Sequence, residues 1–392
     1  MKIALVSPYE FDYPGGVGRH VAALARCFRQ GGHQVGIIAP GSGDLDDRDD
    51  GIFRIGRVTP VPANGSIARI TLSLRMVRRI KDILASERFD IVHVHEPLMP
   101  ALSPTVLRYS QAVNIGTFHA FRHSYYGYRY GRPLLKLIMN KLEARIAVSR
   151  VALGYVSQYF PGTYTIIPNG VDLQRFRCDV APIERYRDGR INILFVGRWE
   201  KRKGLTYLIR AYELLRGDFP QTRILVVGPE GRHSRSYRDY VELHGLRGIE
   251  FVGPVADDEL PRFYRTCDIF CAPSTRGESF GMILPEAMAS GQPIVTTDIE
   301  GYRDIVTHGE QGLLVPPRDQ YALANALAYL ITHPAERERM AQAGLRAAQN
   351  YSWERIGRRV LNLYGEVLDG RHSLSNQPSP LSLQQGLTLE AP

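Results

Sequence analysis

Long apolar runs and cysteines are both scarce in this 392-residue sequence. No stretch approaches the roughly 20 consecutive apolar residues of a membrane-spanning helix. The apolar start KIALV stops at Ser7 and Pro8, which is too soon for the hydrophobic region of a secretory signal. The four cysteines are dispersed without a CxxC pair, at Cys27, Cys178, Cys267 and Cys271. We therefore expect a soluble, cytoplasmic chain with reduced thiols rather than a membrane-spanning or disulfide-stabilised protein.

Acidic residues are outnumbered by basic ones, 40 against 49, which gives a formal net charge of +9. Such an excess is compatible with binding to nucleic acid, anionic lipid or an anionic substrate, and equally with a solvated, arginine-rich surface. The net charge alone does not distinguish between these alternatives, so a binding partner has to be inferred from local clusters of residues.

Short apolar segments bounded by Gly, Pro, Ser or Asp alternate with amphipathic stretches of helical length along the chain. This alternation is typical of α/β proteins. One series begins at KIALVSPY and a second begins at INILFVGRW, and their continuous apolar character favours parallel sheets covered on both faces. The sequence therefore predicts two Rossmann-like, doubly wound parallel-sheet domains facing a central cleft, with ligands at the carboxyl ends of the strands.

The length of the chain favours two domains. A polar, Pro- and Gly-bearing linker is expected at residues 171–190, between a first domain at 1–170 and a second at 191–350. The amphipathic stretch 351–369 is expected to be a last helix that packs back on the first domain. Residues 370–392 are rich in Ser, Gln and Pro, which predicts a disordered tail.

Each half has a loop after its first strand that suits an anionic or hydroxylated ligand. In YPGGVGRH, Gly15 and Gly16 allow backbone amides at a helix start to approach a ligand closely. A plain tight turn is the alternative, and the G-x-G-x-x-G fingerprint of dinucleotide sites is absent. In VGRWEKRKG, Arg198 and Lys203 place two cations beside a helix N-terminus, which favours a diphosphate over a merely solvated basic turn.

The stretch RGESFGMILPEAMASG places Glu278 and Glu286 among apolar and small residues. Buried carboxylates need partners. Because carboxylates would repel a diphosphate held by Arg198 and Lys203, we expect both glutamates, across the cleft, to accept hydrogen bonds from sugar hydroxyls. The alternative is that one glutamate is a charge at the start of a helix and the other is a charge in a loop. Backbone amides at the same ligand are expected from Ser279, Phe280, Gly281 and Met282.

Taken in this order, the motifs resemble the retaining nucleotide-sugar glycosyltransferases of family four, which have the two-Rossmann GT-B architecture. The resemblance rests on Gly15-Gly16 with His20, His119 in GTFHA, IPNGVD at 167–172, Gly197-Arg198 with Lys203-Gly204, and Glu278 with Glu286 in an E-x7-E pattern. Through HVHEP, NGSIAR and GTFHA, the first half is most similar to bacterial phosphatidylinositol alpha-mannosyltransferases. This implies GDP-mannose as donor and a phosphoinositide lipid as acceptor. The basic, aromatic segment AFRHSYYGYRYGR after His119 departs from that subfamily.

The resemblance also implies roles for single residues and retention of the anomeric configuration. The catalytic set would be His119, Arg198, Lys203 and Glu278. The donor-binding set would be Gly15, Gly16, Val255, Ser279, Phe280, Gly281, Met282 and Glu286. No metal and no cofactor beyond the nucleotide-sugar co-substrate is expected. The alternative for His119 is a core histidine without a catalytic role. We interpret His93, His95 and Glu96 as structural or cleft-lining residues rather than as metal ligands.

Residues 66–84, SIARITLSLRMVRRIKDIL, interleave cations with apolar residues at helical spacing. This predicts docking on anionic lipid, and so a peripheral location on the inner face of the cell membrane. An ordinary covering helix with a solvated basic face is the alternative. The docking residues would be Arg69, Arg75, Arg78, Arg79 and Lys81.

Four other functions fit parts of the sequence. A family-four enzyme could use a UDP-sugar with a soluble or another lipid acceptor. A non-catalytic lipid- or sugar-binding protein is disfavoured by the intact set of Arg198, Lys203 and Glu278. A two-carboxylate glycosidase would leave the paired cations without a role. Nucleic acid is not expected as a partner, because RHSYYGYRYGR is the only basic stretch with stacking aromatics. The sequence does not predict the oligomeric state.

Overall fold

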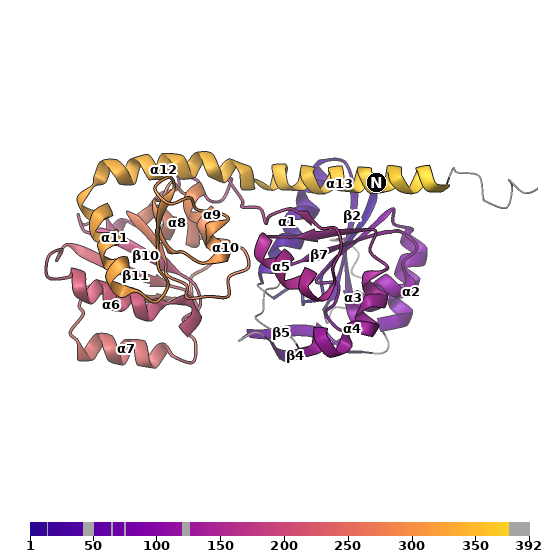
Figure 1. Ribbon diagram of the computed structural model, residues 1–392, viewed down its shortest axis with the longest axis horizontal. Helices are drawn as coiled ribbons and strands as arrows, with labels where there is room; N and C mark the ends of the chain where they lie inside the picture. Colours follow the sequence, from indigo (N-terminus) through magenta and orange to yellow (C-terminus); the bar gives the residue numbers. More distant parts are fainter. Residues whose placement is uncertain (14, 42–50, 64–65, 74–75, 120–125, 376–392) are drawn as a thin grey trace, which may run out of the picture.

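The computed structural model describes residues 1–13, 15–41, 51–63, 66–73, 76–119 and 126–375. Within these residues, two parallel sheets with helices on both faces form two halves that lie next to each other (Figure 1). An antiparallel hairpin of β4 (Val58–Ala63) and β5 (Ser66–Thr71) is added to the first half. The predicted α/β class with two doubly wound parallel sheets is confirmed.

The first sheet has the strand order β3-β2-β1-β6-β7-β8-β9. Its central strands are buried along their length, as expected where helices cover both faces of a parallel sheet. The strands are β1 (Lys2–Val6), β2 (Gln34–Pro40), β3 (Ile52–Ile55), β6 (Ile91–His95), β7 (Val113–Phe118), β8 (Ala144–Ala147) and β9 (Thr165–Ile166).

Two helical layers enclose this sheet, because successive strand residues point to opposite faces. Val6 and Val94 face a core shared with α2, α3, α4 and α5, whereas Leu5 and Ile91 face a core shared with α1 and α13. The helices are α1 (Gly16–Gln30), α2 (Met76–Glu87), α3 (Leu102–Tyr109), α4 (Tyr126–Met139), α5 (Arg150–Tyr159) and α13 (Trp353–Ser375).

The second sheet has the order β12-β11-β10-β13-β14-β15. Its strands are β10 (Ile191–Val196), β11 (Thr222–Val227), β12 (Ile249–Gly253), β13 (Ile269–Ala272), β14 (Ile294–Thr297) and β15 (Gly312–Val315). One face packs on α6 (Leu205–Leu215), α7 (Ser234–Leu243) and α11 (Gln320–Thr332). The other face packs on α8 (Leu260–Thr266), α9 (Ile283–Ala289) and α10 (Glu300–Arg303). The remaining elements are α12 (Pro334–Ala348), η1 (Glu184–Tyr186), η2 (Lys201–Lys203) and η3 (Gln349–Tyr351).

The last helix, α13, follows the second half in sequence but packs on the first, beside α1 (Figure 1). Ile356, Val360 and Tyr364 belong to the same core as Phe28 of α1. The helix runs to Ser375, so the predicted end at residue 369 is wrong. Gly370 costs only about 1 kcal/mol relative to alanine inside a helix, which does not suffice to end one. The predicted tail from 376 onward lies outside the described residues.

The basic stretch 66–84 is not one helix. Its first part is strand β5, with Arg69, and α2 begins only at Met76. The alternating SIARIT pattern suits a strand, and the helical-spacing interpretation overlooked it. The sequence analysis also omitted β3 and the β4–β5 hairpin, which are short additions outside the repeating strand–helix pattern.

Candidate active site

The two loops predicted to contact the donor follow neighbouring strands of the second sheet. Arg198 and Lys203 come after β10, and Glu278 comes after β13, which pairs directly with β10. Neighbouring parallel strands end at the same edge, so the cations and the carboxylate belong to the same half. The prediction that Glu278 faces these cations from across the cleft is therefore wrong.

Glu278 is buried, and its Oε1 atom is held by two cations. Nη1 of Arg202 donates to Oε1 over 2.6 Å, and Nζ of Lys203 lies 2.8 Å from the same oxygen. Glu200 forms a second bridge, with Oε2 accepting from Nε of Arg202 over 2.9 Å and Oε1 lying 3.2 Å from Nε of Arg198. Three cations and two carboxylates thus alternate in one network, which leaves one positive charge in excess.

This network explains why a carboxylate is buried at position 278. Burial alone would raise the pKa of Glu278, but the charges of Lys203 and Arg202 outweigh burial and hold the pKa below its usual value. The side chain is therefore ionised at neutral pH. It occupies a position beside Lys203 that a phosphate oxygen would also favour.

Gly204 sets the position of Lys203. Its φ of 75° lies in the left-handed region, and a Cβ there would come within 1.8 Å of the carbonyl oxygen of Pro273. Only glycine fits such a site. Beside it, the backbone N–H of Thr275 donates to the carbonyl of Arg202 over 2.7 Å. The turn that carries the cations is thereby fixed to the loop that carries Glu278.

Arg202 is a site residue that the sequence analysis missed. It bridges Glu200 and Glu278, and its own side chain is mostly buried. The signal was present, since Arg202 lies in the basic turn KRK between the two cations that were singled out. Choosing among three adjacent cations required their side-chain directions, which the spacing of a short turn does not give.

Glu286, on α9, has a different environment from Glu278. Its Oε2 atom accepts a hydrogen bond from the hydroxyl of Tyr264 over 2.9 Å. Burial raises the pKa of Glu286, and the hydrogen bond from Tyr264 and the charge of Arg19 only partly oppose this. One carboxylate of the E-x7-E pair is therefore held ionised by cations, whereas protonation of the other is favoured by burial.

Two of the predicted donor-binding glycines lie at the start of α1. Gly15 directly precedes the helix and Gly16 is its first residue. A Cβ added at Gly16 would meet nothing within 4 Å. The packing of the protein therefore does not require glycine at position 16, whereas close approach of a ligand to the helix start would.

The remaining residues predicted to bind the donor differ in the environments of their side chains. Gly281 has a φ of 70°, and a Cβ there would lie 2.5 Å from the ring of Tyr302, so the fold itself requires glycine. The ring of Phe280 is buried against Tyr351, which leaves only its backbone for a ligand. Val255 and Met282 are partly buried at the edge of the same core.

His119, at the end of β7, is joined to the second half by Ser279. The Ser279 hydroxyl donates to the carbonyl oxygen of His119 over 2.5 Å. Within the first half, the backbone N–H of His119 donates to Oε1 of Glu96 over 2.6 Å. The structure thus brings His119 next to the loop that contains Glu278, as the sequence predicts for residues that share a ligand.

Four imidazoles gather behind this contact, those of His20, His93 and His95 buried and that of His119 partly buried. Nε2 of His119 lies 3.0 Å from Nδ1 of His95, the ring of His95 stacks on that of His93, and Nδ1 of His20 lies 2.8 Å from Oδ1 of Asn169. Burial lowers the pKa of all four, to about 4 for His20 and about 3 for His93. The rings are therefore neutral at physiological pH.

Within the described residues, this cluster is also the group whose geometry would suit a metal ion. One nitrogen from each of His20, His95 and His119 lies within 4.8 Å of the others. We interpret the cluster as a hydrogen-bonded set, because His95 and His119 are bonded to each other and His20 is bonded to Asn169.

The IPNGVD motif forms the junction between the halves. Its Asn169 binds His20, and a Cβ added at Gly170 would lie 2.5 Å from the ring of Trp353, the first residue of α13. Val171 continues the junction, with its N–H donating to the carbonyl of Tyr351 over 2.7 Å. The motif therefore fixes the place where the chain leaves and re-enters the first half.

Comparisons with known proteins agree with this geometry. The Glycosyltransferase Family 4 model matches residues 14–175, and the Glycosyl transferases group 1 model matches residues 181–347. A phosphatidyl-myo-inositol mannosyltransferase from Mycobacterium leprae is 35% identical, over 94% of this chain and 97% of its own. The chain belongs to the family-four glycosyltransferases. A second protein of the same name, from Propionibacterium freudenreichii, is 31% identical over 93% of this glycosyltransferase and 94% of its own chain.

Solved structures share the fold of this glycosyltransferase. A glycosyltransferase from Rickettsia africae superimposes with a TM-score of 0.76 at 22% identity, covering 94% of this chain and 98% of its own. The sucrose-phosphate synthase of Thermosynechococcus elongatus gives 0.75 at 23% identity, covering 94% and 99%. The predicted GT-B architecture and the predicted family are both confirmed.

The residues predicted to dock this glycosyltransferase on lipid have varied environments. Arg69 forms an ion pair with Glu10 and stacks on the ring of Tyr13. Arg78 and Lys81 are exposed on α2, Arg79 is half-buried, and Arg75 lies outside the described residues. The apolar residues of α2 point into the core, where Met76, Ile80 and Ile83 are buried. The prediction that apolar neighbours of these cations enter the membrane is therefore wrong for α2.

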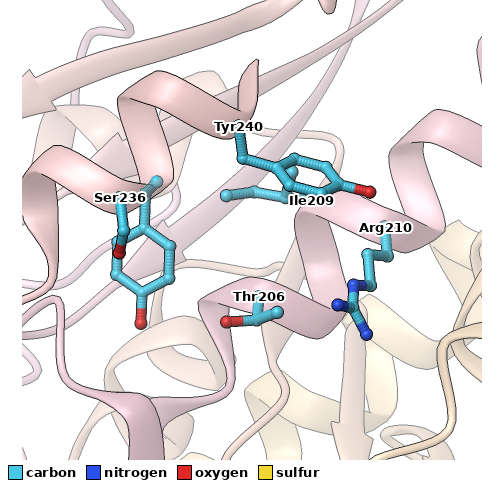
Figure 2. Close-up of a pocket in the computed structure, with 6 residues that line it drawn as sticks. Thr206, Ile209, Arg210, Ser236 and Tyr240 are labelled. Atoms are coloured by element: carbon cyan, nitrogen blue, oxygen red, sulfur yellow. The ribbon is translucent and has the colours of Figure 1, made fainter. Parts of the chain in front are cut away.

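A pocket of the glycosyltransferase lies away from these residues, between α6 and α7 (Figure 2). Arg210 and several hydroxyl groups line it, and Figure 2 shows them on the two helices. Its lining is Thr206, Ile209, Arg210, Ser236, Tyr237 and Tyr240. No predicted site residue is among them, so this pocket is separate from the predicted donor site. Among the described helices, none has the length and apolar character needed to cross a bilayer.

The imidazole cluster should make the glycosyltransferase sensitive to acid. The ordinary imidazole pKa of 6.5 applies after unfolding, whereas the folded pKa is about 4 for His20 and about 3 for His93. As the pH falls from 6.5 towards 4, the unfolded chain therefore binds protons that the folded chain does not, and stability is lost. Replacing His93 with asparagine should reduce this loss by about 1.4 kcal/mol per pH unit. Urea unfolding at pH 7 and pH 5 measures the difference, and an unchanged pH dependence would contradict the neutral cluster.

Proposed function

We propose that this glycosyltransferase moves mannose from GDP-mannose to a membrane lipid of the phosphatidylinositol class, with retention of the anomeric configuration. The observation that carries the proposal is the network of Arg198, Arg202, Lys203 and Glu278 at the ends of two adjacent strands, in contact with the His119 region. The relatives named phosphatidyl-myo-inositol mannosyltransferase support the choice of sugar and acceptor.

The cations would stabilise the leaving group. The bond between the anomeric carbon and the phosphate oxygen breaks, and its electron pair moves to the diphosphate beside Arg198 and Lys203. Charge that develops next to cations already in position costs no reorganisation of the site. The acceptor hydroxyl forms the new bond from the same face, and its proton passes to the departing phosphate oxygen.

Glu278 would exchange partners when the donor binds. It pairs with Lys203 and Arg202 in this structure, and a diphosphate would compete with it for the same cations. The displaced carboxylate would then accept hydrogen bonds from the sugar hydroxyls. Glu278 would therefore have partners in both states: cations before the donor binds, and sugar hydroxyls afterwards.

His119 would act as a neutral hydrogen-bonding group on the sugar. Burial lowers its pKa well below the ordinary value, so the ring does not supply a proton at neutral pH. In this arrangement the first half faces the acceptor and the membrane, and the second half holds the nucleotide sugar.

A thermal unfolding screen tests the donor. A ligand that binds only the folded state at a hundred times its dissociation constant stabilises the protein by about 2.7 kcal/mol. We expect GDP-mannose and GDP to raise the melting temperature by several degrees, and UDP-sugars at the same concentration to have little effect.

Transfer to lipid provides the second half of the test. Vesicles containing phosphatidylinositol should accept mannose from GDP-mannose, and the product should keep the alpha configuration by NMR. Stabilisation by UDP-sugars alone would overturn the donor, and transfer only to water-soluble sugars would overturn the acceptor.

A further inference from the structure

Helix α4 exposes a row of large apolar side chains. Tyr130, Leu134 and Leu137 are 76%, 68% and 62% exposed, whereas Tyr128 and Met139 on the same helix are buried in the core. The three exposed residues are spaced at i, i+4 and i+7, which places them on one side of the helix. Large apolar groups that gather on an exposed surface mark an interaction site.

The same helix carries exposed cations. Arg129, Arg132 and Lys136 alternate with the apolar residues along α4 and are themselves exposed. The sequence of α4, YGYRYGRPLLKLIM, contains no acidic residue. A helix with apolar and basic residues on its exposed surface has the character of one that lies in a membrane interface.

The neighbouring helices extend this positive surface. α2, α3 and α4 pack on the same face of the first sheet, with α3 in contact with both of the others. Arg78 and Lys81 are exposed on α2, and Arg108 is exposed on α3, where Lys81 lies over the ring of Tyr109 at 4.4 Å. In Figure 1, α4 lies on the side of the first half opposite α13.

We propose that this glycosyltransferase docks on an anionic bilayer by inserting Tyr130, Leu134 and Leu137 of α4 into the headgroup boundary, while the cations of α2, α3 and α4 contact lipid phosphates. The apolar contribution comes from α4, because the apolar residues of α2 are used in the core. The proposal specifies the membrane partner of the proposed function, yet it rests on the exposed residues of α2, α3 and α4 and requires no particular donor or acceptor.

Vesicle sedimentation of the full chain tests the docking surface. Wild-type protein should sediment with vesicles of phosphatidylcholine and phosphatidylglycerol. The triple variant Tyr130→Ser/Leu134→Gln/Leu137→Gln should bind them more weakly by on the order of a hundredfold, because three apolar side chains no longer leave water. The matched control is Leu243→Gln, which removes a leucine that is 83% exposed on α7 of the second half, and it should bind as the wild type does.

The charges are tested separately. Arg129→Gln/Arg132→Gln/Lys136→Gln should lose the preference for vesicles with phosphatidylglycerol over vesicles of phosphatidylcholine alone. The fluorescence of Leu134→Trp should shift to shorter wavelength on anionic vesicles. The two native tryptophans give a constant background, because the fold holds them at fixed positions. Wild-type vesicle binding by the apolar triple variant would overturn the proposal. So would a fluorescence shift of Leu134→Trp that depends on protein concentration without vesicles, since it would indicate a second copy of this chain on α4.

Stabilisation by GDP-mannose is measured on each variant and separates this proposal from the proposed function. Retained stabilisation with lost vesicle binding supports α4 docking and shows that the variant is folded. Absence of any donor effect in wild-type protein that still binds vesicles would count against the function and leave the docking surface standing. Loss of donor stabilisation in the triple variant alone would mean that α4 supports the fold, and would overturn the proposal.

Discussion

Replacing Lys203 with alanine is expected to lower the rate of sugar transfer by about a hundredfold or more. Lys203 is held in place by the turn at Gly204 and lies 2.8 Å from Glu278. Its charge is therefore already in position when the leaving group becomes negative, and alanine cannot replace it. A radiochemical transfer assay at saturating donor measures the effect, because the loss should appear in kcat as well as in KM.

The matched control for this variant is Lys201→Ala. Lys201 lies in the same turn but is exposed, and among the described contacts it makes no ion pair with Glu278. Its removal should change transfer by less than about threefold, as is usual for surface positions. Near-normal turnover of Lys203→Ala, or an equal loss in both variants, would remove Lys203 from the mechanism.

Replacing Glu278 with glutamine should separate nucleotide binding from transfer. The carboxylate is proposed to contact the sugar, so transfer should fall by about a hundredfold. Binding of GDP alone should stay as tight as in the wild type or tighten by up to about tenfold, because the charge that competes for Lys203 and Arg202 is gone. Calorimetric titration with GDP and the transfer assay give the two numbers.

Glu200→Gln is the control for the charge change. Glu200 belongs to the same network but bridges Arg198 and Arg202 rather than Lys203. Its replacement should also preserve or tighten GDP binding, while transfer stays within a few-fold of the wild type. If Glu278→Gln loses GDP binding as severely as it loses transfer, the carboxylate supports the nucleotide site and its proposed contact with sugar is wrong.

The sequence singled out residues that the structure brings together, but it did not predict which of them pair. Arg198 and Lys203 were singled out because they follow a strand, where ligands of such sheets lie, and Glu278 because it is a carboxylate among apolar and small residues in the E-x7-E pattern. The pairing of Glu278 with Lys203 was not predicted. It depends on β13 lying next to β10 in the sheet, and no local sequence pattern specifies the order of the strands. Arg202 was missed for a similar reason, because three adjacent cations differ only in the directions of their side chains.

The stretch predicted to dock on a membrane shows the same limit. The helical spacing in 66–84 was taken as an interfacial face, yet residues 66–71 form a strand and the apolar residues of α2 are in the core. An amphipathic pattern shows that a helix has an apolar side, and the rest of the fold decides whether that side meets protein or lipid. For α4, only the structure shows that Leu134 and Leu137 are exposed and are not packed into the core.

The packing of α13 means that the first half is assembled from segments that precede and follow the second half in sequence. Tyr364 lies against His93 and Phe28, and Trp353 lies against His20 and the backbone of Gly170. On the ribosome, domains generally fold as units, the N-terminal one first. Here the N-terminal half emerges early but lacks one of its helices until α13, which follows the second half in sequence, has been synthesised. The second half can complete its own core sooner, so the order of maturation is the reverse of the order of synthesis.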